Sequence, residues 1–321
     1  MLLPFTVVLI FSFCAEVVLQ RGWITVMKRM KMEQVTKLYG PAWHEKTKMG
    51  TPTMGGVVFI PVLVLSLPLI MFWGRGHSLS DAVRILLYPV LAAAVGFIDD
   101  WLKYTRHSSD GLTSLKKLAL QIAVTLPWAL WVSRPPYELM PWLRLPYPVY
   151  AAAVTFIGVG LQNAVNVTDG LDGLAAGCSL ISFIAALIFL PRSPLTALTV
   201  ACACGICLGF LWHNANPASV FMGDVGAHFL AGYMLSLCIN SGLLIMVIPI
   251  CFIFGAEIFS VTLQIFAIRR LHRKIFLMSP LHHHFEMLGW KETQIVSRFY
   301  IAHMIGICVL SVLLFYLMTR H

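Results

Sequence analysis

Apolar segments of membrane-spanning length constrain this chain more than any other feature of its sequence. A helix needs about 20 mostly apolar residues to cross a bilayer. Ten such segments occur, near residues 2–19, 54–73, 82–98, 116–133, 148–164, 174–190, 195–212, 225–240, 242–267 and 297–318. Only 12% of the residues are charged, about half the share in a soluble domain. We therefore predict an all-α, polytopic integral membrane protein with about ten transmembrane helices, forming a single domain over residues 1–321.

Lysine and arginine are unequally distributed between the two sides of this predicted bundle. Counting short flanks, the loops after odd-numbered spans hold 17 of the 23 basic residues. Cytoplasmic loops of membrane proteins are enriched in Lys and Arg. We therefore predict that these loops face the cytoplasm and that both termini lie outside. The formal net charge of +9 suits an anionic membrane face and anionic substrates.

Five polar motifs fall at the loops on this predicted cytoplasmic side. They are KMGTPTMGG (48–56), GFIDDWLK (96–103), NAVNVTDGLDGLAAG (163–177), FMGDVG (221–226) and SPLHHHFE (279–286). Carboxylates beside apolar spans are costly to keep, so they mark functional sites by default. Five aspartates from three separate loops face the same compartment, which predicts one composite active site on the cytoplasmic face.

The motif at 163–177 carries the densest run of polar groups. Asn163, Asn166, Asp169 and Asp172 follow one another at steps of three residues. Residues three apart are neighbours on a helical turn, so each group lies beside the next while the row drifts around the helix. The alternative, a polar helix cap, needs only one such residue.

Two adjacent aspartates end the third predicted span. Side chains of adjacent helical residues diverge by about 100°, so Asp99 and Asp100 are expected to have different roles. Lys103 lies four residues after Asp99 and on the same face. The group is either a surface ion pair or a general base, or orienting carboxylate, beside a phosphate-binding lysine. Paired acids also suit Mg²⁺, which takes one or two carboxylates plus substrate phosphates.

The remaining charged candidates are single residues at loop positions. Asp224, at the mouth of the eighth span, is a candidate magnesium ligand, with a helix N-cap as the alternative. Asn214 is a candidate polar contact nearby and a candidate substrate-binding residue. Lys48, with Thr53 in a Gly/Pro-rich turn, suggests an anion clamp. Lys117, like its neighbour at 116, either binds phosphate or anchors the topology.

The run His282–His284 is unusual. A zinc site is a weak alternative, because consecutive residues cannot all aim at one ion and no cysteine is close. Hydrogen bonds from imidazole to phosphate or ribose oxygens fit better. Glu257 and Gln264 lie seven residues apart on the ninth span, hence on one face, and are expected to face a shared cavity.

Together and in this order, the five motifs resemble those of the polyprenyl-phosphate N-acetylhexosamine-1-phosphate transferases, and the likeness covers nearly the whole chain. PLHHHFE is similar to the muramoyl-pentapeptide branch. The resemblance implies a ten-helix homodimer in the bacterial cytoplasmic (inner) membrane that binds no nucleic acid. It implies transfer of phospho-MurNAc-pentapeptide from UDP-MurNAc-pentapeptide to undecaprenyl phosphate, with Mg²⁺, giving lipid I and UMP for peptidoglycan synthesis.

The resemblance also implies roles for individual residues. The catalytic aspartates would be Asp99, Asp100 and Asp224, with Asp224 as the metal ligand. The substrate-binding positions would be Lys48, Thr53, Lys103, Lys117, Asn166, Asp169, Asp172, His282 and His283. The nucleoside pocket would contain Asn163, Phe221 and Gln264. One departure is Leu161-Gln162, where the family usually has small polar residues.

Three questions stay open at this level. The donor could instead be UDP-N-acetylglucosamine, as in other members of the superfamily. The chain could be a cation-coupled transporter, although such a site should lie near the bilayer midplane and between internal repeats, and no repeat is evident. For the transfer itself, we favour direct attack by the lipid phosphate with Asp99 as base over a covalent intermediate on a carboxylate.

Overall fold

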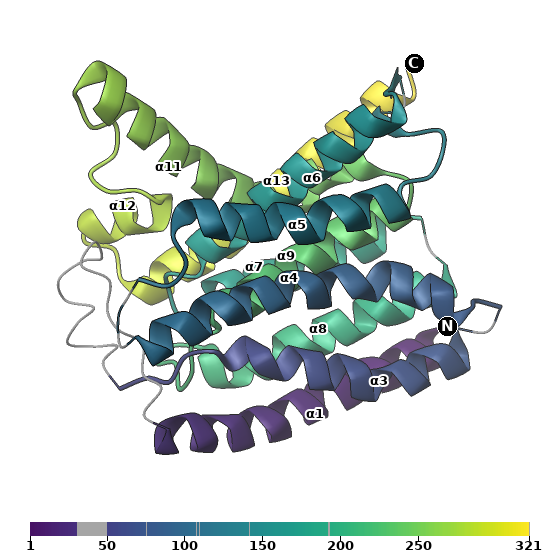
Figure 1. Cartoon of the computed structure of the whole chain (residues 1–321), viewed down its shortest axis with the longest axis horizontal. Helices are drawn as coiled ribbons and strands as arrows, with labels where there is room; N and C mark the ends of the chain where they lie inside the picture. The colour runs from purple at the N-terminus through teal and green to yellow at the C-terminus, as the bar shows by residue number, and fades with distance from the viewer. Residues whose placement is uncertain are drawn as a thin grey trace.

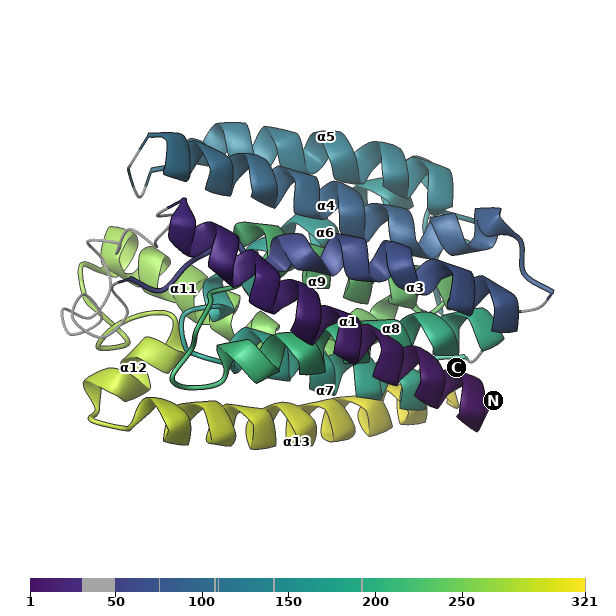
Figure 2. The same ribbon diagram turned by 90° about the horizontal axis from the view of Figure 1, so that it is seen from below.

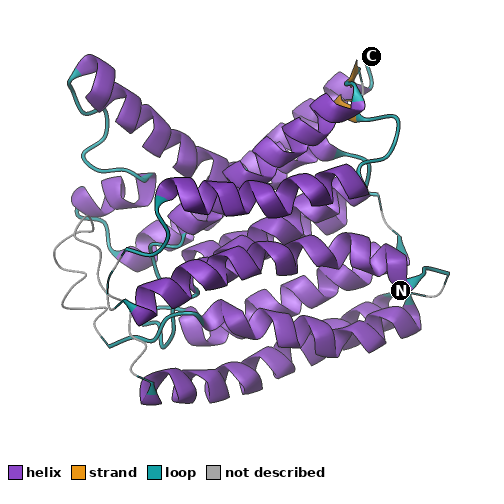
Figure 3. Ribbon diagram, in the orientation of Figure 1, coloured by secondary structure: helices purple, strands orange, loops and turns teal. Residues whose placement is uncertain are grey.

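The structure, a computed structural model, is a bundle of long helices with one polar end. It describes residues 1–30, 50–74, 76–106, 108, 110–140, 142–191 and 193–320. Both termini lie at one end of the bundle, and the short helix α12 lies at the opposite end (Figures 1 and 2). The described chain is helical almost throughout, apart from one small strand pair (Figure 3).

The helices of the first half are α1 (Leu2–Arg29), η1 (Gly55–Val58), α3 (Phe59–Trp73), α4 (Leu79–Thr105), α5 (Ser114–Val132) and α6 (Tyr147–Thr168). The second half contains α7 (Leu174–Phe189), α8 (Pro194–Asn214), α9 (Gly223–Asn240), η2 (Leu244–Met246), α10 (Val247–Ile250), α11 (Phe252–Leu271), α12 (Leu281–Met287) and α13 (Glu292–Met318). The antiparallel strands β1 (Glu138–Met140) and β2 (Leu143–Arg144) form a hairpin between α5 and α6 that the sequence did not predict.

Helices form in all ten predicted apolar segments, one of which is interrupted, and this confirms an all-α polytopic membrane protein. Eight of the described helices are long and apolar enough to cross a membrane. The other two segments are α7, which has only 16 residues, and α9. Helix α9 includes Asp224 and His228, and nearly all of its residues are buried. The orientation of the termini relative to the cytoplasm stays a prediction.

One predicted span is interrupted. We expected a continuous helix over 242–267, but the chain forms η2 and α10, leaves helical geometry at Cys251, and continues as α11 to Leu271. Backbone groups at the break are bonded by distant side chains. Ser182 Oγ donates to the carbonyl of Ile250 at 2.6 Å, and the N–H of Ile253 donates to His303 Nδ1 at 3.3 Å. Such breaks are tolerated within membrane proteins when neighbouring helices supply these partners. Beyond the break, α11 diverges from the bundle (Figure 1).

Helix α9 lies in the core of the bundle, and its packing against α4 positions the polar end. Gly96 of α4 lies so close to the carbonyl of Asp224 that a Cβ there would overlap it. At the other end of the contact, Gly232 of α9 packs against Pro89 and Ala92 of α4. Because small residues let the two backbones approach, the last turns of α4 meet the first turn of α9.

Candidate active site

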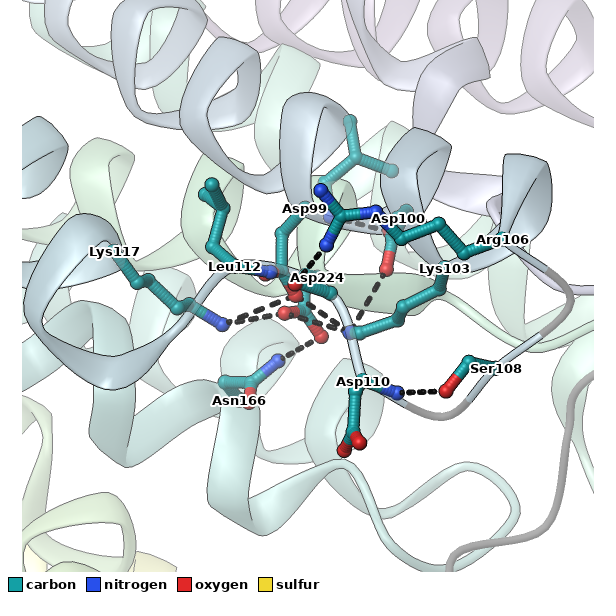
Figure 4. Close-up of polar contacts among 12 residues, drawn as sticks. Asp99, Asp100, Lys103, Arg106, Ser108, Asp110, Leu112, Lys117, Asn166 and Asp224 are labelled. Carbon is teal, nitrogen blue, oxygen red and sulfur yellow. Dashed lines mark hydrogen bonds and ion pairs between the residues drawn. The ribbon is translucent and has the colours of Figure 1, made fainter.

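Three predicted catalytic aspartates converge where α4 ends and α9 begins. Asp99 and Asp100 belong to the last turns of α4, and Asp224 belongs to the first turn of α9 (Figure 4). Their exposed fractions are 2%, 5% and 6%, respectively. One oxygen from each lies within 4.8 Å of the others. The sequence placed these acids at one end of the bundle, and the structure brings them into a single cluster.

Two lysine ammonium groups lie among the three carboxylates. Lys103 Nζ is 2.6 Å from an oxygen of Asp99, 3.1 Å from one of Asp224 and 3.4 Å from one of Asp100. Lys117 Nζ reaches from α5 to bond Asp224 and lies 3.6 Å from Asp99 (Figure 4). The five residues form an aspartate–lysine cluster with one more carboxylate than ammonium groups. The expected pairing of Asp99 with Lys103 is confirmed, and of the two lysines that open α5, it is Lys117 that enters the cluster.

Backbone and amide donors hold the aspartates in place. The N–H of Leu112 donates to Asp99 Oδ1 at 2.7 Å, and the N–H of Val225 donates to Asp100 Oδ2 at 3.1 Å. Asn166 Nδ2 donates to Asp224 Oδ1 at 2.6 Å. With the lysine contacts, all six carboxylate oxygens have a partner. Asp99 faces both lysines, whereas Asp100 turns toward the start of α9, so the two adjacent acids do point in different directions.

The loop at 50–56 is joined to the loop that carries Asp224. The N–H groups of Gly55 and Gly56 donate to the carbonyls of Phe221 and Met222, and the N–H of Phe221 donates to the carbonyl of Pro52. Three backbone bonds therefore join the loop that carries Thr53 to the segment that leads from Phe221 to Asp224. Thr53 and Phe221 are both half-buried. The prediction for Lys48 falls outside the described residues.

The row from Asn163 to Asp172 does not face a single site. Asn166 contacts the cluster through Asp224. Asn163 Nδ2 donates to Gln121 of α5 at 3.1 Å and to the backbone of its own helix. Asp169, half-buried, ends α6. The drift of a three-residue spacing around the helix, which the sequence indicated, separates the directions of these groups.

Asp172 and Asn214 brace the loop that leads to Phe221. Asp172 Oδ2 accepts the N–H of Ala218 at 3.0 Å and the side-chain amide of Asn216 at 3.1 Å. Asn214 accepts the N–H of Gly173 at 3.0 Å and donates to the carbonyl of Val220 at 2.9 Å. Both were predicted as substrate-binding residues. In the structure, these contacts link the start of α7 to the 215–220 loop.

The three histidines of α12 have different partners. His282, with 1% exposed, bonds Glu257 of α11 through Nδ1 at 3.1 Å. His283 Nδ1 pairs with Glu286 at 2.6 Å on the same helix. The N–H of Leu277 donates to His284 Nδ1 at 3.1 Å. The three rings therefore serve separate contacts.

Gln264 and Glu257 hold the backbone of the segment between α11 and α12. Gln264 Oε1 accepts the N–H groups of Ile275 and Phe276 at 3.0 Å each, and its Nε2 donates to the carbonyl of Phe276 at 2.9 Å. Glu257 accepts backbone N–H groups at the start of α12. The two residues share a face of α11 as predicted, but that face binds backbone where we expected an open cavity.

The departure at Leu161-Gln162 concerns helix packing. Gln162 is fully buried, and its Nε2 donates to the hydroxyls of Tyr88 at 2.9 Å and Thr125 at 3.3 Å. These bonds connect α6 with α4 and α5 inside the bundle. The residue therefore lies in an interhelical contact, one turn from Asn166.

Sequence reasoning missed two parts of the site. The N–H donors of Leu112 and Val225 carry no side-chain signal, so only the fold reveals them. Glu257 was noticed as a buried acid in α11 but was not assigned to the site. The sequence does indicate that Glu257 has a partner, because an acidic residue within an apolar span needs one, but it does not show which residue that is.

The aspartate–lysine cluster suits a hard divalent cation. Among the described residues, Asp99, Asp100 and Asp224 are the group whose ligand atoms lie close enough to share one ion. Carboxylate oxygens are the ligands that Mg²⁺ prefers. The lysine side chains retain exposed fractions of 24% and 16%, so the cluster is not fully closed to solvent. A buried triple-aspartate group of this kind can hold a metal ion.

Comparison with known proteins gives consistent similarities. The family described as Glycosyl transferase family 4 matches residues 82–242, and the phospho-N-acetylmuramoyl-pentapeptide-transferase signature 1 matches residues 48–60. A phospho-N-acetylmuramoyl-pentapeptide-transferase of Lacticaseibacillus paracasei is 37% identical over 95% of this chain and 96% of its own length. Proteins with the same name from Staphylococcus saprophyticus and a Picosynechococcus strain are 38% and 37% identical, over 86% and 91% of this chain and 89% and 82% of their own lengths.

Proposed function

The chain belongs to the phospho-N-acetylmuramoyl-pentapeptide-transferase family, and on that premise we propose the reaction that it catalyses. It transfers phospho-MurNAc-pentapeptide from UDP-MurNAc-pentapeptide to undecaprenyl phosphate, forming lipid I and UMP in peptidoglycan synthesis. The observation that carries this proposal is the aspartate–lysine cluster, because both substrates are phosphate anions. The relatives' names and the signature favour the muramoyl-pentapeptide donor over UDP-N-acetylglucosamine, and a transferase over a transporter.

The reaction exchanges one phosphoanhydride bond for another. An oxygen of the lipid phosphate attacks the phosphorus attached to the sugar, and the bond from that phosphorus to the bridging oxygen of UMP breaks. Lys103 and Lys117 bind the phosphate oxygens of the two substrates as these displace the carboxylates from the ammonium groups. Positioning and charge neutralisation supply most of the catalysis in phosphoryl transfer.

The aspartates have separate tasks in this proposal. Asp224, which both lysines and Asn166 contact, is the magnesium ligand, with Asp100 beside it. When bound, Mg²⁺ neutralises charge on the diphosphate and on the departing UMP. Asp99 accepts the proton of a singly protonated lipid phosphate. We favour direct attack by the lipid phosphate over a covalent intermediate on a carboxylate.

The family and the helical bundle support a proposal for the membrane location, orientation and oligomeric state of the enzyme. The enzyme is a multi-pass protein, and we propose that it lies in the bacterial inner membrane with the aspartate–lysine cluster at the cytoplasmic face. The basic asymmetry of the loops supports this orientation. We also propose the homodimer that the resemblance implies, which light scattering of the purified protein would test.

An assay with purified full-length protein tests the proposed function. The protein is incubated with UDP-MurNAc-pentapeptide, undecaprenyl phosphate and magnesium, and UMP and lipid I are quantified. We expect UMP and lipid I in equal amounts, and no turnover when UDP-N-acetylglucosamine replaces the donor. Equal turnover of both donors would contradict the donor assignment. Absence of UMP with either donor would contradict the proposed transferase activity.

A further inference from the structure

A buried carboxylate–imidazole pair lies outside the aspartate–lysine cluster. Glu257 is fully buried in α11. Its Oε2 accepts the N–H of Leu281 at 2.6 Å, and its Oε1 accepts the N–H of His282 at 3.2 Å. The same Oε1 lies 3.1 Å from His282 Nδ1. One carboxylate therefore fixes both the start of α12 and the ring of His282.

The hydrogen bonds around Glu257 determine which ring nitrogen of His282 carries a proton. An ionised carboxylate can only accept hydrogen bonds, and its two backbone partners are both donors. The ring nitrogen that faces it, Nδ1, must therefore donate as well. Carboxylates commonly select the tautomer and orientation of a histidine in this way.

The other ring nitrogen, Nε2, faces the turn between α6 and α7. His282 is 1% exposed, and its Nε2 has no hydrogen-bond partner among the described residues. It lies against Gly170, where an added Cβ would overlap it. A buried N–H without an acceptor is rarer in proteins than a buried acceptor with a spare lone pair. These contacts favour the Nδ1–H tautomer, which leaves a lone pair on Nε2 beside the turn that carries Asp169.

We propose that Glu257 is a positioning residue for the proposed transfer reaction. It holds His282 in the Nδ1–H tautomer, so that Nε2 accepts a hydrogen bond from an O–H or N–H group of the donor substrate at the 169–172 turn. This changes the role expected for His282. An Nε2 without a proton accepts a hydrogen bond from a hydroxyl or amide and cannot donate one to a phosphate oxygen.

The rest of the histidine run does not share this arrangement. His283 has a carboxylate partner on its own helix, Glu286, and its side chain is 14% exposed. His284 accepts a backbone N–H. Only His282 combines a carboxylate from another helix with a buried nitrogen that lacks a partner, so the inference concerns this ring alone.

Kinetics of Glu257→Gln test the proposal, because a glutamine amide can donate to Nδ1 and so favours the opposite tautomer. We expect kcat/KM for the donor to fall about 10- to 100-fold, as when the outer partner of a metal-bound histidine is removed. In a His282→Ala background, Glu257→Gln should have little further effect. Glu138→Gln, in an exposed ion pair of the hairpin, is the matched control and should leave turnover unchanged. Equal losses from Glu257→Gln in both backgrounds would overturn the proposal.

A second variant tests the proposed substrate contact at Nε2 of His282. Gly170→Ala leaves Glu257 intact but places a methyl group where Nε2 lies. We expect a comparable loss in kcat/KM for the donor, and an unchanged value would count against a substrate contact at Nε2. This variant keeps the proposal testable if Glu257→Gln fails to fold.

The tautomer itself is measured by ¹⁵N NMR of histidine-labelled protein, with His282 assigned by its loss in His282→Ala. We expect a protonated Nδ1 and an unprotonated Nε2 in the wild-type protein, and the reverse in Glu257→Gln. A proton on Nε2 of the wild-type ring would overturn the proposal. This measurement needs no turnover, so it stands even if the wild-type protein forms no UMP and the proposed function fails.

Discussion

The aspartate–lysine cluster and the histidine segment of α11 and α12 both pair acids with nitrogen groups, but in different ways. In the cluster, three carboxylates surround two ammonium groups, and each lysine contacts more than one acid. In the histidine segment, each acid bonds one imidazole, and Glu257 also bonds backbone. The first arrangement allows partners to be exchanged for a metal ion and phosphates. The second fixes side chains in one geometry.

The largest expected effect comes from removing a charge in the cluster. Asp224→Asn keeps the size of the side chain but removes an anionic oxygen that both lysines contact. We expect turnover to fall roughly 10²- to 10⁴-fold, because several kcal/mol of charge stabilisation depend on this position. UMP release by the purified variant measures the loss. Asp110→Asn, an exposed acid in the neighbouring loop, is the control and should behave like the wild type. A similar loss in both variants would mean that Asp224 contributes no more to turnover than an exposed acid in the neighbouring loop.

Removing a cation should cost less. Lys117→Met deletes the ammonium group that bonds Asp224, while Lys116→Met changes an exposed neighbour at the start of the same helix. We expect kcat/KM to fall about 10- to 100-fold for Lys117→Met, because the preorganised phosphate contact is lost, and to stay unchanged for Lys116→Met. Initial rates over a range of donor concentrations would show the difference. A larger loss in Lys116→Met than in Lys117→Met would contradict a phosphate contact at Lys117.

In the histidine segment, the expected effect is on donor binding. His283→Ala removes a half-buried ring paired with Glu286, and we expect KM for the donor to rise about 10-fold, a loss near that of one charge-assisted hydrogen bond. His284→Ala removes the acceptor of the Leu277 N–H, so it should lower thermal stability while KM changes little. Steady-state kinetics and thermal unfolding of both variants separate these outcomes. Unchanged kinetics in a well-folded His283→Ala variant would indicate that the ring of His283, like that of His284, has only a structural role.

The smallest effect on catalysis is expected at Gln264. Gln264→Ala removes three hydrogen bonds to the backbone of Ile275 and Phe276 and should lower the free energy of unfolding by about 1–3 kcal/mol. We expect kcat/KM to stay within about 3-fold of the wild type, since stability is the main loss. Thr262→Ala, on an exposed face of the same helix, is the control for both measurements. A large rise in KM for the donor, with an unchanged free energy of unfolding in Gln264→Ala, would indicate instead that Gln264 contacts the substrate.

The two regions also differ in how far the sequence predicted them. The sequence predicts the helices from the length of the apolar segments, and it predicts that the polar motifs lie at one end of the bundle from the charge of the loops. Both are local properties. The pairing of Lys103 with Asp99 follows from helical spacing. The choice of Lys117 over its neighbour depends on how α5 packs, and the sequence does not specify this.

Other features depend on partners that are distant in sequence. The break at Cys251 lies in a continuous apolar run, and Ser182 and His303, on other helices, bond the freed backbone groups. Asp172 and Gln264 have residue types typical of substrate contacts, yet both bond backbone of nearby loops. Polar side chains within a membrane bundle serve either purpose, and only the fold decides between them.

We propose that Asp224 holds the metal while Asp99 serves the lysines and the attacking phosphate. A magnesium titration of turnover for the wild type, Asp224→Asn and Asp99→Asn tests it most directly. We expect the magnesium concentration for half-maximal rate to rise strongly in Asp224→Asn, and to stay near the wild-type value in Asp99→Asn although its maximal rate falls roughly 10²- to 10⁴-fold. Wild-type magnesium affinity in Asp224→Asn, with weakened affinity in Asp99→Asn, would contradict the account and reverse the two roles.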